Sequence, residues 1–190
     1  MTNIFKKATL SLALIGLLSS AASAERVFTY ATKGSHHNMD PMSVYDVPTH
    51  AMGVNIYDGL VKRDENLVMQ PGLALSWENL SDLVWRFTLR QNVKFHDGSP
   101  FSADDVVFSF NRGVSKGSDI KGALSSIAKI VKIDDFTVEV HTKSKNPILP
   151  SEIYSLPIFS KIWCEKNKAV QVADATSKEE GYADRHANGT

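Results

Sequence analysis

The chain has 190 residues, and its 21 basic and 21 acidic side chains balance to a formal net charge of zero. This balance gives no electrostatic reason to expect binding to nucleic acid or to an anionic membrane. Cys164 is the single cysteine, which excludes a disulfide within the chain.

The first residues have the pattern of an export signal. Lys6 and Lys7 precede the apolar run "LSLALIGLL", and "SSAASA" follows it with a small-residue cleavage site. The apolar run has about 10 residues, well short of the roughly 20 that a spanning helix needs. We therefore expect a signal peptide over residues 1–24, cleaved after Ala24, rather than the alternative of an uncleaved membrane anchor.

Residues 26–66 predict a strand, a loop and a short helix. "RVFTYAT" at 26–32 is β-branched and aromatic with alternating faces, which favours a strand. Residues 33–50 are rich in Gly, Ser, Asn, Asp and Pro, which favours a loop. A helix should follow from residue 51 to near Tyr57, and then a strand from Gly59 and a turn at 64–66.

Two hairpins are predicted next, and then two helices. The first hairpin pairs 75–78 with 84–90 through a turn at 79–82, and its apolar side chains alternate at Trp85, Phe87 and Leu89. Core packing is the preferred interpretation of these side chains, and ligand stacking is the alternative for the two aromatics. The second hairpin spans 127–142, and 145–167 predicts a helix, a loop and a helix.

The stretch "HDGSPFSADD" at 96–105 concentrates reactive side chains, but its spacing is poor for chemistry. His96 and Asp97 are adjacent, and no second histidine lies three or four residues from His96, as a zinc site on a helix would require. Neither serine of the stretch lies in a G-x-S-x-G nucleophile elbow. These absences argue against a metal site or a catalytic nucleophile here.

The same stretch fits the start of a helix. Asp97-Gly98 is a turn pair because glycine adopts a positive φ without strain. Ser102 is placed for an N-cap, and Asp105 three residues later completes a variant of the capping box. The helix that follows carries one apolar stripe, formed by Val106, Val107 and Phe110.

The histidine loop is the other candidate for chemistry. His36, His37, Asp40 and His50 could together hold a metal ion. Adjacent histidines give no regular helical or strand geometry, however, so solvated loop histidines are the preferred interpretation. His36 and His37 could also contact a ligand through hydrogen bonds.

Three segments resemble one protein family. "SHHNMDPMSVYD" together with "IYDGLVKRDENLVMQPGLALSWE" is similar to the opening of the extracellular solute-binding proteins of family 5. "WRFTLRQNVKFHDGSPFSADDVVFSFNR" resembles the most recognisable stretch of that family, and "IVKIDDFTVEVHTKSKNPILP" resembles the hairpin and proline run that follow it. Family 5 contains the dipeptide and oligopeptide receptors of ABC importers.

The resemblance implies an incomplete α/β fold of the periplasmic-binding-protein type II kind, in which two lobes close around a ligand by hinge motion. Relatives are longer, so the chain is expected to be an N-terminal fragment without the second lobe. Residues 25–54 would form the opening strand and cleft loop of lobe one. Residues 55–158 would form a small mixed α+β accessory subdomain, and 159–190 would start the return into lobe one.

The implied function is binding without catalysis, cofactor or metal. The expected partners are a peptide or other small solute and an ABC permease in the inner membrane, and the protein would be a periplasmic monomer. The family includes receptors for dipeptides, longer peptides, glutathione, nickel complexes, sugars and opines. The alternatives are a truncated, non-functional remnant and a metal-binding protein that uses His36 and His37.

The resemblance places the rim of the ligand cleft in the loop from Lys33 to Tyr45. The expected ligand contacts there are Gly34, Ser35, His36, His37, Asn38 and Tyr45. For each of them, the alternative is a solvated or turn-forming residue.

Overall fold

The computed structural model describes residues 38–174 and 180–190, all of which belong to one compact unit over 34–190. The signal peptide expected at 1–24 and the strand expected at 26–32 lie outside the described residues. The described elements in chain order are α2 (Val47–Gly53), β1 (Val61–Arg63), β2 (Met69–Pro71), β3 (Ala74–Ser81), β4 (Val84–Leu89), α3 (Ala103–Gly113), the 3₁₀ helix η1 (Asp119–Gly122), β5 (Ile127–Asp134), β6 (Thr137–Thr142), α4 (Leu149–Ile153), α5 (Lys161–Lys166) and α6 (Tyr182–Arg185).

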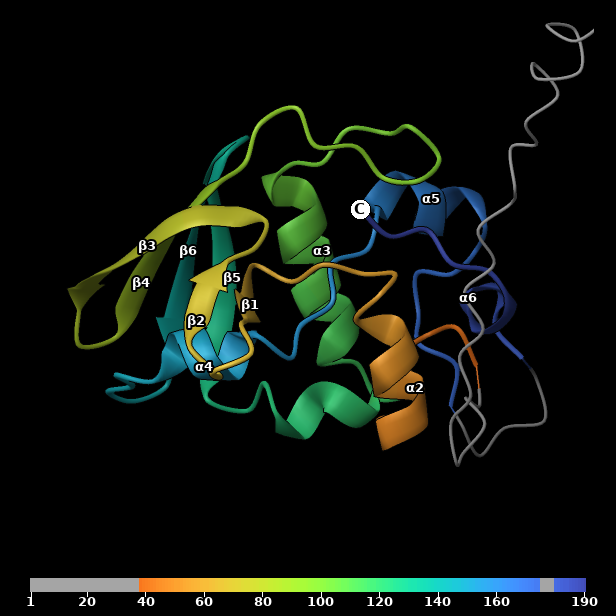
Figure 1. Cartoon of the computed structure of the whole chain (residues 1–190), viewed down its shortest axis with the longest axis horizontal. Helices are drawn as coiled ribbons and strands as arrows, with labels where there is room; N and C mark the ends of the chain where they lie inside the picture. Colours follow the sequence, from red (N-terminus) through yellow and green to blue (C-terminus); the bar gives the residue numbers. More distant parts are fainter. Residues whose placement is uncertain (1–37, 175–179) are drawn as a thin grey trace, which may run out of the picture. The chain divides into compact units, whose positions relative to one another are not determined.

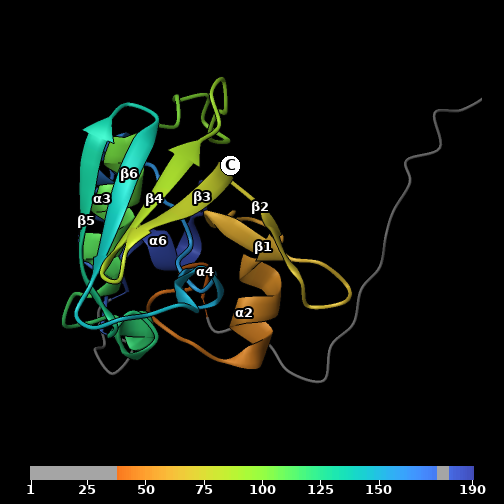
Figure 2. The ribbon, with the colours of Figure 1, turned by 90° about the vertical axis from the view of Figure 1, so that its left-hand side faces the viewer.

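The main sheet has four antiparallel strands in the order β3-β4-β6-β5. Figure 2 shows the four strands side by side with α3 lying across one face. The short β1-β2 pair forms a separate sheet (Figure 1). Both predicted hairpins are therefore present, and the arrangement is mixed α/β with partial sheets.

The core lies between α3 and the sheet face that it covers. Phe87 of β4 lies opposite Val138 of β6, and both side chains are fully buried. Val106 and Phe110 of α3 are buried as well, which confirms the predicted apolar stripe. The core interpretation is confirmed for Phe87 and Leu89, which are buried, and for Trp85, which is partly buried and packs against the core. The indole N–H of Trp85 donates to the backbone carbonyl of Asn146 at 3.1 Å.

The predicted end of β3 was wrong. β3 continues to Ser81, through residues expected to form a turn, because Asn79 pairs with Trp85 and Ser81 with Val84 across an irregular register. β3 is an outer strand, so its polar side chains can face solvent while its backbone pairs with β4.

The helix expected over 51–57 in fact covers Val47–Gly53. The carboxylate of Asp46 accepts a hydrogen bond from Thr49 N at 2.9 Å and caps the first turn. Pro48 is tolerated there because the first N–H groups of a helix have no partner within it.

The predicted turn and capping box at 96–105 are confirmed. Gly98 has φ of 84° and donates its N–H to Phe95 O at 2.8 Å. Ser102 caps α3, and Asp105 Oδ2 accepts from Ser102 N at 2.9 Å. Asp105 Oδ1 also accepts from Lys161 N at 2.8 Å, so one carboxylate joins the starts of α3 and α5.

Candidate functional site

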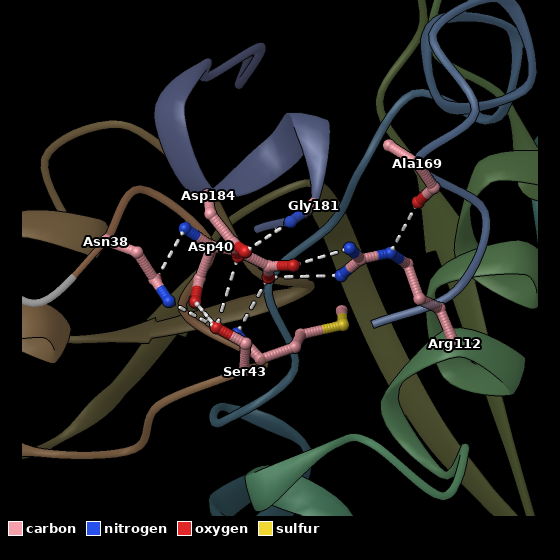
Figure 3. Close-up of polar contacts among 8 residues, drawn as sticks. Asn38, Asp40, Ser43, Arg112, Ala169, Gly181 and Asp184 are labelled. Atoms are coloured by element: carbon pink, nitrogen blue, oxygen red, sulfur yellow. Dashed lines mark hydrogen bonds and ion pairs between the residues drawn. The ribbon is translucent and has the colours of Figure 1, made fainter. Parts of the chain in front are cut away.

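A buried ion pair anchors part of the predicted cleft loop, which runs from Lys33 to Tyr45. Arg112, near the end of α3, donates to both carboxylate oxygens of Asp40, at 3.1 and 2.5 Å (Figure 3). Each of these two side chains is 1% exposed. Arg112 also donates through Nε to Ala169 O at 3.1 Å, and its guanidinium lies 4.5 Å from the centre of the Phe159 ring. Arg112 therefore joins the end of α3 to the segments that contain Asp40, Ala169 and Phe159.

The charge of this pair is balanced within the cluster. Burial opposes the charge on Arg112, but the Asp40 carboxylate more than offsets that effect and raises the pKa of the guanidinium above its usual value. Because the two groups match in fork geometry and charge, neither has to be buried as an isolated ion.

Short polar contacts shape the backbone around Asp40. Asp40 Oδ1 accepts from Met42 N at 3.0 Å, and Asn38 Oδ1 accepts from Asp40 N at 3.0 Å. The amide of Asn38 donates to the hydroxyl of Ser43 at 2.5 Å. These contacts form the Asx-type turns that Asn-x-Asp-Pro sequences favour, and they close residues 38–43 into a compact turn.

Asp184 of α6 holds the same turn from the other side. Its carbonyl accepts from Met39 N at 2.7 Å. Its carboxylate accepts from Ser43 Oγ at 3.4 Å and from Gly181 N at 2.7 Å (Figure 3). Burial raises the pKa of the Asp184 carboxyl. Residues 38–43 are thus bracketed by α3 on one side and α6 on the other.

A small open pocket lies beside this anchored turn. Its lining includes Tyr45, His50 of α2, Tyr154 after α4, and the charged side chains of Asp58 and Lys62. The His50 ring meets the Tyr45 and Tyr154 rings edge-on, with centroids 5.5 and 6.2 Å apart. His50 Nε2 lies 3.4 Å from the Tyr154 hydroxyl.

The size of this pocket limits what it can hold. Its volume is about 80 Å³, room for several water-sized groups, since one such group needs roughly 10–15 Å³. The aromatic faces suit an apolar or aromatic side chain, and His50 with the Tyr154 hydroxyl can exchange hydrogen bonds. The pocket therefore fits a single side chain or a chain terminus rather than a whole peptide.

Only two of the predicted contact residues lie within the described part of the chain. Gly34, Ser35, His36 and His37 lie outside it. The side chain of Asn38 is engaged in the turn described above, whereas Tyr45 is 45% exposed and lines the pocket. Within residues 38–174 and 180–190, no group of three or more His, Cys, Asp or Glu side chains is arranged to hold a metal ion.

The sequence did not reveal Arg112, Asp184 or Tyr154 as parts of this region. Arg112 follows Phe110 at the end of an apolar stripe, and a basic residue near a helix C-terminus is ordinarily solvated. The available signal was the position of Arg112 next to the buried face of α3. A buried arginine side chain requires an acidic partner. Sequence alone could not select Asp40 from the 21 acidic residues.

The histidine of the "HDGSPFSADD" stretch has a structural role. His96 N donates to Gly189 O at 2.8 Å, and Gly189 N lies 3.3 Å from His96 Nδ1. Asp97 N donates to Asn188 Oδ1 at 2.9 Å. The turn is thus paired with residues 188–189.

Comparison with known proteins is consistent with a binding protein. Periplasmic oligopeptide-binding protein OppA of Salmonella typhimurium is 30% identical over 59% of this chain and 23% of that protein. The dipeptide-binding protein of Escherichia coli is 32% identical over 74% of this chain and 30% of that protein. These homologues are binding proteins, not enzymes.

Solved structures agree at the level of the fold. Haemophilus influenzae OppA, in complex with RPPGFSPFR, matches with a TM-score of 0.68 and 28% identity over 73% of this chain and 31% of that one. Helicobacter pylori DppA, an ABC transporter-associated periplasmic binding protein in complex with the peptide STSA, matches with a TM-score of 0.66 and 27% identity over 82% of this chain and 34% of that one.

The chain spans between 23% and 34% of the length of these four proteins. A family model described as bacterial extracellular solute-binding proteins, family 5 Middle, matches residues 68–190, which is more than half of the chain. The chain therefore belongs to the family 5 bacterial extracellular solute-binding proteins.

Proposed function

We propose that this chain forms the N-terminal part of a periplasmic receptor that binds peptides, or a chemically related small solute, for an ABC importer. The observation that carries the proposal is family membership combined with relatives named for oligopeptide, dipeptide and glutathione binding. No helix among the described residues is both long and apolar enough to cross a bilayer. Delivery to an inner-membrane permease by a monomeric receptor belongs to the same proposal.

The geometry supports a role for the loop that ends at Tyr45. Its anchored part, residues 38–43, is fixed by Arg112 and Asp184. Gly34, Ser35, His36 and His37 directly precede this anchor in the sequence. A fixed backbone lowers the entropy lost when neighbouring groups order around a ligand. The proposed contacts are therefore these four residues with Tyr45, while Asn38 acts through the turn.

The pocket beside the loop supports a peptide-like ligand. Asp58 and Lys62 supply one negative and one positive side chain to its lining, which can attract the amino and carboxylate ends of a zwitterion. Tyr45, His50 and Tyr154 supply flat surfaces against which one ligand side chain can pack. Further contacts to a whole peptide would have to come from outside this pocket.

Native mass spectrometry of the 190-residue protein with a dipeptide and oligopeptide mixture tests the proposal. We expect a retained peptide, and we expect Tyr45→Ala and His50→Ala each to weaken its retention severalfold. Tyr182→Ala is the matched control, because Tyr182 is an exposed tyrosine outside the pocket that stacks on His186. Absence of any retained peptide would contradict peptide binding by this chain.

The truncated remnant is the second candidate. It is favoured by the small share of each relative that the chain covers and by the outer edges of β3 and β5, which pair with no strand among the described residues. A remnant should unfold without cooperativity and associate through these edges. A cooperative thermal transition of a monomeric product would argue against it. Elemental analysis after mild chelation separates both candidates from a metal carrier based on His36 and His37, which would retain stoichiometric metal.

A further inference from the structure

A second hollow lies away from the Tyr45 pocket, between the last turn of α3, η1 and the first half of β5. Its volume is about 440 Å³, several times that of the Tyr45 pocket. Its apolar lining is formed by Phe110, Val114, Leu124, Ile127 and Ile130. Val114 remains 40% exposed, so part of this apolar floor is open to solvent. We call this hollow the β5 groove.

The charges on the β5 groove are of one sign. Lys121, Lys129 and Lys143 line it, and the lining contains no acidic residue. Lys121 Nζ donates to Lys116 O at 3.0 Å, and Lys143 Nζ donates to Ser125 O at 2.7 Å. None of these three lysines forms an ion pair with a described carboxylate, so the groove carries uncompensated positive charge.

Three other described lysines have acidic partners. Lys132, three residues after Lys129 on β5, lies 2.7 Å from Asp104 Oδ2 and 2.7 Å from Asp135 Oδ1. Lys145 pairs with Asp82 at 2.9 Å, and Lys161 pairs with Glu165 at 2.6 Å. Lys62, Lys94, Lys116, Lys166 and Lys168 also form no ion pair with a described carboxylate. What distinguishes the groove is that three such lysines gather in one lining that contains no acidic residue.

The groove also borders a free strand edge. β5 pairs only with β6, and Figure 2 shows no described segment beyond its other side. An outer strand presents unpaired N–H and C=O groups to which an extended chain can add. Antiparallel self-pairing of β5 in the register that sets Ile130 opposite Val131 would also set Lys129 opposite Lys132, and like charges directly opposite each other are unfavourable.

We propose that the β5 groove binds an extended, acidic segment of a partner protein. The backbone of the segment pairs with the free edge of β5. Its carboxylates contact Lys121, Lys129 and Lys143, and an apolar side chain of the segment covers Val114. This surface is separate from the Tyr45 pocket, so it serves docking to a partner rather than solute binding.

The test uses the 190-residue protein and three fluorescein-labelled peptides. The first probe is the acidic, strand-forming acetyl-EVEVEVE-amide, the second replaces every Glu with Lys, and the third is acidic with a central proline. Fluorescence anisotropy at low and high salt gives the affinities. We expect the acidic strand-former to bind, the basic peptide not to bind, the proline peptide to bind more weakly, and added salt to weaken binding.

Two triple variants with the same change in net charge complete the test. Lys121→Gln, Lys129→Gln and Lys143→Gln together should weaken binding of the acidic peptide on the order of tenfold. Lys132→Gln, Lys145→Gln and Lys161→Gln together should leave binding within about twofold, because those lysines already have acidic partners.

The proposal is overturned if no peptide binds, if the basic peptide binds as well as the acidic one, or if the two triple variants weaken binding equally. Self-association through β5 in a sedimentation experiment would identify a second copy of the chain as the occupant and overturn the proposal. Binding to phosphatidylglycerol vesicles without binding to the acidic peptide would identify a membrane as the occupant and also overturn it. These readouts do not involve solute retention at the Tyr45 pocket.

Discussion

The guanidinium of Arg112 and the carboxylate of Asp40 form a bidentate, almost fully buried ion pair across 72 positions of sequence. A buried pair of this kind does not by itself imply high stability, because desolvation offsets much of the attraction. Its removal on one side is costly, however, because the remaining charge is then buried without a partner. Arg112 therefore determines where the turn at 38–43 rests.

Arg112→Met should lower the free energy of unfolding by about 3–5 kcal/mol, since Asp40 would be left as an uncompensated buried charge. Urea denaturation followed by circular dichroism measures the change. The double variant Asp40→Leu with Arg112→Met should lose less than the single variant, because neither charge remains. If the double variant is the less stable of the two, desolvation of Asp40 is not the cause.

Lys145→Ala is the surface control for this experiment. Lys145 pairs with Asp82 at 2.9 Å, and the two side chains are 71% and 69% exposed. Exposed ion pairs contribute little because solvent screens them and both side chains lose freedom. The urea midpoint of Lys145→Ala should therefore stay close to that of the unmodified protein.

Asp105→Ala should cost about 2 kcal/mol of stability, roughly the sum of two lost caps. The carboxylate of Asp105 accepts from Ser102 N at the start of α3 and from Lys161 N at the start of α5. Asp104→Ala, one residue earlier on the exposed side of the same turn, should have a clearly smaller effect in the same urea titration. Equal effects of the two substitutions would show that Asp105 acts through the α3 helix dipole alone.

The sequence predicted the elements better than the contacts between them. Both hairpins, the apolar stripe of α3 and its Ser102–Asp105 capping box were predictable because they depend on periods of two or four residues and on local turn chemistry. The start of α2 was missed because loop-forming residues dominate 33–50, although Asp46 and Pro48 are typical of a helix start.

The site was less predictable for a physical reason. Tyr45 was expected from the resemblance, but Arg112, Asp184 and Tyr154 reach their places only through tertiary packing of α3, α6 and the segment after α4. No local pattern encodes a partner 72 or more residues away. The second contact of Asp105, with Lys161 N, was missed for the same reason.

Gly98→Ala should destabilise the protein by about 1–2 kcal/mol, whereas Gly122→Ala should be neutral or slightly stabilising. A Cβ atom would meet nothing within 4 Å at either position, so crowding does not distinguish them. Gly98 has a φ of +84°, which strains a residue with a side chain. Thermal denaturation of the two variants would therefore measure backbone strain alone, and equal melting temperatures would contradict it.

Alkaline pH should destabilise the fold through Cys164 and Tyr57. Burial raises the pKa of the Cys164 thiol from its usual 9.0 to about 12 and also raises the pKa of the Tyr57 hydroxyl. Both folded-state pKa values lie above the unfolded ones, so the folded protein holds these protons more tightly. The associated stability is complete below pH 9 and is lost as the pH rises towards 12.

Urea midpoints between pH 8 and pH 11 measure this loss, and Cys164→Ala should flatten the part of the profile that begins near pH 9. Because Cys164 is fully buried, its thiol should react with Ellman's reagent at pH 8 only after denaturant is added. A thiol that reacts rapidly in the folded protein, or a Cys164→Ala profile as steep as that of the unmodified chain, would show that Cys164 is not held protonated by burial. Tyr57→Phe should flatten the remaining slope at higher pH, which separates the two contributions.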